Sequence, residues 1–139
     1  MNIETQIHIH ATPEKVWGVL TDFDKYSDWN PFVKSLTGEV AVGNQITVAL
    51  LGMAFKPIIL KFEKNKELRW LGKLLFKGLF DGEHYFILQE NKADTTTFIH
   101  GENFDGVLVG LFKKKLLTET IAGFEAMNEA LKVRVEGGD

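Results

Sequence analysis

Two histidines and a glutamate are the residues of this chain with the clearest capacity for chemistry. His84 shares one face of an extended segment with Phe86. In the following segment, Phe98, His100 and Glu102 share one face. Because alternate residues of a strand lie on one face, the apolar partners indicate that the three polar side chains point inward. Such a cluster could orient a ligand hydroxyl, carbonyl or carboxylate, or could act as a general acid or base. A satisfied internal hydrogen-bond network is the structural alternative.

The loop between these two segments decides how the histidines meet. It is short enough for a hairpin, and pairing Glu90 with Asp94 across it sets His84 directly opposite His100. Directly opposed residues have Cβ atoms about 5 Å apart. The spacing of the two histidines and Glu102 matches no established metal site, so no metal is expected. These three residues are candidates for catalysis, and the sequence assigns a catalytic role to none of them.

Composition excludes several function classes. The 139 residues, of which 45% are hydrophobic, fit one domain over 1–139. The chain has no cysteine, which excludes thiolate chemistry, and its net charge of −3 gives no reason to expect nucleic acid as a partner. No apolar run approaches the roughly 18 residues of a membrane span, and the N-terminus lacks the order of a signal peptide. We therefore expect a cytoplasmic protein. No phosphate-binding glycine loop is present, and no cofactor is expected.

The elements that must position these side chains begin with a strand over 3–9, in which apolar and polar residues alternate. Thr12-Pro13-Glu14 is then typical of a helix start, with a capping hydroxyl, a proline in the first turn and an acidic residue near the positive helix end. Asp22 is expected to cap a second short helical turn. Pro31 forces the preceding residue into an extended conformation and ends the helical region.

The middle of the chain is rich in β-branched, aromatic and aliphatic runs separated by turn residues. No helical pattern interrupts these runs, which indicates an antiparallel sheet. The strands expected here are 45–51, 55–63, 68–71, 82–90 and 95–104.

The last segment is an amphipathic helix. About twenty residues of it would extend roughly 30 Å, enough to cross a sheet, and Gly137-Gly138 should end it. Asn128 falls inside the apolar stripe and therefore needs hydrogen-bond partners. The apolar run 107–112 is out of phase with the stripe, so we expect a bend or an irregular segment near 106–110. The stripe consists of Leu117, Ile121, Phe124, Leu131 and Val135.

The order of strand, two short helices, a series of strands and long helix resembles the helix-grip fold of the START-like (SRPBCC) superfamily, and most of all its polyketide cyclase/dehydrase-type branch. The resemblance covers nearly the whole chain. It implies an α+β fold in which a seven-stranded antiparallel sheet wraps around the C-terminal helix, with two short helices after the first strand. It also implies an apolar cavity between sheet and helix. The motifs that carry it are Ala11-Thr12-Pro13-Glu14-Lys15-Val16-Trp17, Asp22-Phe23, Tyr26, Trp29-Asn30-Pro31, Glu67-Leu68-Arg69-Trp70, Gly82-Glu83-His84-Tyr85-Phe86, Phe104-Asp105-Gly106, Gly123-Phe124, Met127-Asn128 and Leu131-Lys132.

Residues of inward parity, together with the polar cluster, should line this cavity. Trp29 could wall it or could anchor the two short helices in the core. The ligand-binding candidates are Trp29, Val48, Leu60, Trp70, His84, Phe86, Phe98, His100, Glu102, Phe124 and Asn128.

Three functions fit this description. We expect non-catalytic binding or transport of a hydrophobic or amphipathic small molecule, such as a lipid, a polyketide or an aromatic compound. The alternatives are a polyketide cyclase/dehydratase-type enzyme that uses a His/Glu pair as acid and base, and a protein-interaction module without a small ligand. A cavity on the order of several hundred Å³ would favour the first two.

Lys113-Lys114-Lys115 follows the apolar run 107–112. Together these residues could touch an anionic membrane transiently while a lipid is exchanged. The alternative is a solvated basic start to the helix. The chain is expected to be a monomer or a homodimer.

Overall fold

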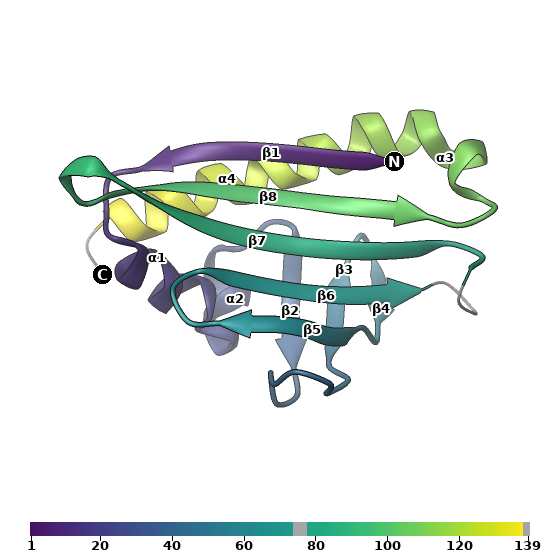
Figure 1. The fold of residues 1–139 in the computed structure, drawn as a ribbon, viewed down its shortest axis with the longest axis horizontal. Coiled ribbons are helices and arrows are strands. Elements are labelled where there is room, and N and C mark those ends of the chain that lie inside the picture. The colour runs from purple at the N-terminus through teal and green to yellow at the C-terminus, as the bar shows by residue number, and fades with distance from the viewer. Residues whose placement is uncertain (74–77, 138–139) are drawn as a thin grey trace.

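Two antiparallel sheets and a long C-terminal helix make up the computed structural model, which describes residues 1–73 and 78–137 (Figure 1). Gly138, expected to help end the helix, lies outside the described residues. The strands are β1 (Asn2–Ile9), β2 (Val33–Thr37), β3 (Thr47–Leu50), β4 (Met53–Phe55), β5 (Ile58–Glu63), β6 (Glu67–Lys73), β7 (Asp81–Asn91) and β8 (Thr95–Asp105). The helical elements are α1 (Pro13–Leu20), η1 (Phe23–Lys25), α2 (Tyr26–Trp29), η2 (Lys92–Asp94), α3 (Val109–Lys115), the π-helical turn η3 (Leu116–Thr120) and α4 (Ile121–Glu136).

The strands form a five-stranded sheet of order β1-β8-β7-β6-β5 and a three-stranded sheet of order β2-β3-β4. The α+β class with an antiparallel sheet and a long C-terminal helix is confirmed, but the single seven-stranded sheet is wrong. The expected strand 55–63 is divided into β4 and β5. Pro57 lies at the division, where its missing N–H cannot join a strand ladder. In Figure 1 the strands of the smaller sheet lie behind β5 and β6 and cross their direction.

The helical region after β1 follows the expected signals with one exception. The Thr12 hydroxyl accepts a hydrogen bond from the Lys15 amide, and Asn30 is extended before Pro31. The expected cap at Asp22 is wrong, because its side chain makes no capping hydrogen bond. The first turn there is instead a short 3₁₀ segment, which leads directly into α2.

The C-terminal helix packs against β1, β8, α1 and α2, and it lies behind β1 and β8 in Figure 1. The irregular segment expected near 106–110 is present at residues 106–108, where a bend and a turn precede the helix start at Val109. A second irregularity, which was not expected, lies at η3. A π turn accommodates one extra residue, which rotates the apolar stripe by about 100°. Thr120 is consequently buried, whereas Leu117, an expected member of the stripe, is 40% exposed. Asn128 is buried within the stripe as expected.

The β7–β8 hairpin differs from its predicted register by two residues. Asn91 pairs with Thr95 across η2, so that His84 lies opposite Glu102 rather than opposite His100. The cause is a loop displaced by one residue along the chain, which uses positive backbone φ angles at Ala93 and Asp94. A shift of two residues keeps every side chain on its face. The side chains of His84, His100 and Glu102 therefore still share the inward face.

A bulge in β5 reverses the expected facing of Leu60. The register with β6 shifts between Ile59 and Lys61, which leaves Leu60 as the extra residue of the strand. Ile59 is fully buried, whereas Leu60 is 39% exposed. Beyond the bulge, Phe62 stacks on Trp17 of α1, with ring centroids 5.5 Å apart. The prediction of an inward-facing Leu60 is wrong for this reason.

Candidate functional site

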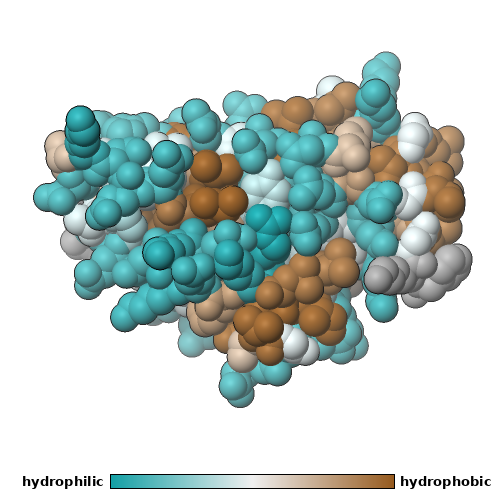
Figure 2. Space-filling model, in the orientation of Figure 1, coloured by the Kyte–Doolittle hydropathy of each residue, from teal (hydrophilic) through white to brown (hydrophobic). Residues whose placement is uncertain are grey.

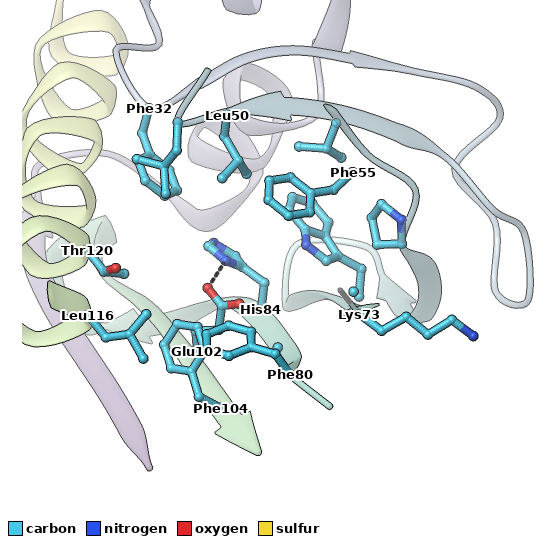
Figure 3. A pocket seen from close by; sticks show the side chains of 16 residues that line it. Phe32, Leu50, Phe55, Lys73, Phe80, His84, Glu102, Phe104, Leu116 and Thr120 are labelled. Carbon is cyan, nitrogen blue, oxygen red and sulfur yellow. Dashed lines mark hydrogen bonds and ion pairs between the residues drawn. The ribbon is translucent and has the colours of Figure 1, made fainter. Parts of the chain in front are cut away.

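A cavity of about 130 Å³ lies between the two sheets and the helix. Its polar lining includes His84 of β7, Glu102 of β8 and Thr120 of η3. It opens beside the exposed residues Leu51 and Lys73. The volume is smaller than the several hundred Å³ typical of a site for a drug-sized ligand. Figure 3 shows apolar side chains on either side of His84 and Glu102, with Phe32, Leu50 and Phe55 on one side and Phe80, Phe104 and Leu116 on the other.

His84 and Glu102 form a hydrogen-bonded pair at the cavity wall. The His84 Nδ1 atom lies 3.0 Å from Glu102 Oε1. The other carboxylate oxygen, Oε2, lies over Gly82, where an added Cβ would stand only 2.1 Å from it. The absence of a side chain at Gly82 therefore gives the carboxylate its place. The His84 side chain is 2% exposed, and that of Glu102 is 17% exposed. Glu102 is thus the more accessible member of the pair.

Behind this pair, the hydrogen bonds continue away from the cavity to β1. His84 Nε2 lies 2.8 Å from His100 Nε2, and His100 Nδ1 lies 3.0 Å from Asn128 Oδ1. The Asn128 amide nitrogen donates to Thr5 Oγ at 2.8 Å, and Thr5 Oγ donates to the His100 carbonyl oxygen at 3.0 Å. Five side chains from β1, β7, β8 and α4 thus form one chain of hydrogen bonds, which we call the relay (Glu102, His84, His100, Asn128 and Thr5). Asn128 obtains in this way the partners that a buried amide needs.

Aromatic rings enclose the two histidines of the relay. Trp70 stacks on His84 with ring centroids 5.1 Å apart, and Phe124 stacks on His100 at 4.0 Å. Burial is the main reason why the pKa of His100 lies well below its usual value, and the neighbouring His84 lowers it further. His100 is therefore a neutral imidazole at physiological pH.

Phe32 is the most informative cavity residue that the sequence did not predict. Its ring contacts both histidines and Phe124, with centroid distances of 6.2, 6.1 and 5.4 Å. The Asn30 side-chain oxygen holds the segment by accepting from the Phe32 and Val33 amides. Gly123 of α4 makes room for the ring, since a Cβ there would approach Phe32 to 2.6 Å. The Asn-Pro-Phe turn and this helical glycine are the signals that could have located Phe32.

The eleven candidate residues fall into three groups. Val48, Trp70, His84 and Glu102 line the cavity. Trp29 and Leu60 lie outside it, since Trp29 packs against Tyr26 with ring centroids 5.4 Å apart and borders a shallow surface depression beside α4. A role in ligand binding stays a prediction for every one of them. The remaining candidates are buried behind the cavity wall, namely Phe86, Phe98, His100, Phe124 and Asn128.

Within residues 1–73 and 78–137, no group of three or more histidine, aspartate or glutamate side chains is arranged to hold a metal ion. In the same described part of the chain, no helix is both long and apolar enough to cross a membrane.

The comparison with protein families gives one match over almost the whole chain. The family described as "Polyketide cyclase / dehydrase and lipid transport" matches residues 1–136. A comparison with curated proteins gives no match.

Solved structures with the same fold come from several bacteria. The protein MLL2253 from Mesorhizobium loti is 19% identical, with a TM-score of 0.80, over 100% of this chain and 99% of that chain. The hypothetical protein jhp0584 from Helicobacter pylori is 16% identical, with a TM-score of 0.81, over 97% of this chain and 88% of that chain. A START superfamily protein from Mycobacterium smegmatis is 22% identical, with a TM-score of 0.72, over 98% and 97%. At these identities the likeness establishes the fold.

Proposed function

Because the chain belongs to the polyketide cyclase/dehydrase and lipid transport family, we propose that it binds a small, largely apolar molecule in the cavity between its two sheets and its helix. One hydrogen-bonding group of the ligand is held by Glu102. The observation that carries the proposal is the contrast between apolar walls and the acid–base pair of buried His84 and partly exposed Glu102. Apolar surface supplies the binding free energy, and a few placed polar groups orient the ligand.

The size of the cavity limits the ligand. An apolar cavity of about 150 Å³ in another protein holds one benzene molecule, and this cavity measures about 130 Å³. A single ring or a short acyl segment therefore fits as the walls stand. A polycyclic molecule or a whole lipid requires the walls at the opening, beside Leu51 and Lys73, to move apart.

Acid–base catalysis is the second candidate function, and one observation favours it. The His84–Glu102 pair reaches the cavity wall and is backed by a third ionisable group, the His100 ring, at 2.8 Å. Such a pair can give a proton to a bound molecule and take one from it, as cyclisation with loss of water requires. A Glu102→Gln variant that still binds ligand but no longer converts it would establish this function.

Helix α3 and the turn before it carry a surface suited to an anionic membrane. Val107 and Leu111 are 80% and 76% exposed, and Lys113-Lys114-Lys115 follows on α3. Figure 2 shows hydrophobic residues gathered at the end of the molecule where α3 lies. The Phe112 ring packs against Phe80 of the cavity wall, with centroids 5.9 Å apart, which ties this surface to the cavity. We propose that this surface touches anionic lipid when the ligand is exchanged.

Sedimentation with vesicles tests the membrane contact. Vesicles of phosphatidylcholine with phosphatidylserine should bind the protein, and neutralising the three lysines of α3 should weaken binding by roughly 100-fold, at about 1 kcal/mol for each lysine. Leu111→Ser should also weaken binding. Val133→Ser is the matched control, because Val133 is 70% exposed on α4, outside this surface. Equal binding to pure phosphatidylcholine would refute the contact.

The binding proposal is tested in two steps. Native mass spectrometry of gently purified protein should reveal a co-purified apolar molecule. NMR titration with p-cresol and toluene, which carry a single ring, should give saturable shifts at Phe32 and Trp70, which line the cavity. Absence of bound mass, together with absence of saturable shifts for both compounds and for a fatty-acid series, would overturn the proposal.

A further inference from the structure

The far end of the relay sets the direction of its hydrogen bonds. Thr5 Oγ lies 3.0 Å from the carbonyl oxygen of His100 and 2.8 Å from the amide nitrogen of Asn128. A hydroxyl has one hydrogen to donate, and a carbonyl oxygen can only accept. Thr5 therefore donates to His100 and accepts from Asn128. Asn128 must then turn its nitrogen toward Thr5 and its oxygen toward the His100 ring.

The orientation of Asn128 places the proton on His100. Asn128 Oδ1 only accepts, so His100 Nδ1, at 3.0 Å, carries the hydrogen. His100 is fully buried, and burial holds its pKa well below the usual value, so the ring has a single N–H. Its Nε2 is consequently bare and accepts. His84 Nε2, 2.8 Å away, must therefore be a donor.

One more proton then lies between His84 and Glu102. Their facing atoms, Nδ1 and Oε1, are 3.0 Å apart and would both be acceptors if no proton lay between them. Either an imidazolium donates to a carboxylate, or a carboxylic acid donates to a neutral imidazole. The pair has no net charge in both states. A relay running in the opposite direction would leave two neutral rings and a carboxylate, with a net charge of −1.

We infer that the cavity takes a neutral molecule bearing a hydroxyl group, rather than an amine or an acid. This inference rests on the proposed function of the cavity as a ligand site. Glu102 Oε2, over Gly82, is placed to accept a hydrogen bond from the ligand hydroxyl. A charged ligand would lose its hydration on entering the cavity and would gain no opposite net charge there in return. The other ionisable residue among the described lining residues, Lys73, is exposed at the opening.

Nitrogen-15 NMR of the ligand-free protein at neutral pH tests the proton positions. The expected result is a hydrogen on His100 Nδ1 with a bare Nε2, and a hydrogen on His84 Nε2. Thr5→Val removes the hydroxyl that orients Asn128 and should mix the His100 tautomers. Thr96→Val is the matched control, because Thr96 is a buried threonine that also donates to a backbone carbonyl but lies outside the relay. A wild-type His100 with its hydrogen on Nε2 would overturn the inference.

Binding of four single-ring compounds tests the ligand class. We expect p-cresol to bind at least about tenfold more tightly than benzylamine or benzoate, since an uncompensated charge is far costlier to desolvate than a hydroxyl. Benzylamine or benzoate binding as tightly as p-cresol would overturn the ligand class. Failure of all four compounds, with toluene as the fourth, would overturn the ligand class, and it would overturn the proposed function as well if there is also no co-purified mass and no saturable shift with fatty acids. The proton positions would remain measurable, because they are determined on the free protein.

Discussion

Substituting Gly82 with alanine should separate the role of the Glu102 carboxylate from that of the cavity space. The added Cβ would stand 2.1 Å from Glu102 Oε2, against an ordinary contact of 3.4–4 Å. The carboxylate is the far end of a flexible side chain, so it should withdraw by roughly an ångström or more while the strand stays in place. The His84 Nδ1–Oε1 distance is 3.0 Å, and a separation much beyond about 3.5 Å no longer makes a hydrogen bond. Gly82→Ala thus breaks the pair without removing either member.

Gly72→Ala is a matched control for this substitution. Gly72 pairs with Gly82 across β6 and β7 and also lines the cavity. Its added Cβ would meet nothing closer than 3.9 Å. Both variants remove the space of one methyl group, and only Gly82→Ala displaces the carboxylate of Glu102. The difference between the two variants therefore isolates the hydrogen bond to the ligand.

The expected changes in affinity and stability follow from the net free energy that one hydrogen bond contributes. A net value of about 1–1.4 kcal/mol predicts that p-cresol binds Gly82→Ala about five- to tenfold more weakly than Gly72→Ala. Loss of the bond between His84 and the partly exposed Glu102 should lower the free energy of unfolding by about 1.5 kcal/mol, offset by about 0.4–1 kcal/mol because alanine restricts the unfolded chain.

NMR titration gives the affinities, and urea unfolding gives the stabilities. Toluene, which has no hydroxyl group, should bind the two variants equally. Equal affinity of the variants for p-cresol, with toluene bound by both, would refute the assignment of Glu102 as the ligand's partner.

Three further substitutions test the relay and the core. His100→Gln should reduce the acid sensitivity of folding. The pKa of the buried His100 is lowered, so in acid the unfolded ring binds a proton that the folded ring does not. The stability of the wild type therefore falls below about pH 6.5, by up to about 1.4 kcal/mol per pH unit. An unchanged slope of unfolding free energy between pH 6.5 and 5 would contradict this. Asn128→Leu should cost about 1–3 kcal/mol in urea unfolding, because it removes the Asn128 oxygen that accepts from the buried His100 Nδ1 group; a stability equal to wild type would argue against the relay. Tyr26→Phe should cost about 1–2 kcal/mol, since the buried Tyr26 hydroxyl donates to the Leu20 carbonyl. Burial, and then Asp22, raises the pKa of Tyr26, so wild type should lose more stability above about pH 10 than the variant.

The polar cluster could be predicted because strand alternation does not change when the hairpin register differs by two residues from the predicted one. His84, His100 and Glu102 keep a common face whenever the register shifts by two residues. Their direct partners could not be predicted, because the choice between two loops of equal length depends on whether residues such as Ala93 and Asp94 accept positive φ. Sequence pattern gives the face of a side chain, and turn conformation gives its neighbour.

The other cavity residues are positioned by local irregularities of helix and strand, which a regular helical or strand period does not predict. The π turn η3 brings Leu116 and Thr120 to the cavity, whereas an uninterrupted α-helical pattern points Leu117 there. The bulge at Leu60 turns one expected lining residue outward. Phe32 reaches the histidines from the turn that leads into β2 of the second sheet, which the expectation of one continuous sheet could not supply. The bulge and the π turn interrupt the regular period, and the contact of Phe32 with the histidines joins segments far apart in the chain, so periodicity alone predicts none of the three.

The stacking of Trp70 on His84, with rings inclined by only 18°, gives the protein an internal optical indicator. An excited indole loses its energy far more readily to an adjacent imidazolium than to a neutral imidazole. The emission of Trp70 should therefore differ between the two proton arrangements of the His84–Glu102 pair. With Trp17 and Trp29 replaced by phenylalanine, the remaining fluorescence would come from the cavity wall alone. A molecule entering the cavity would then be detected by a change in Trp70 emission, without any added label.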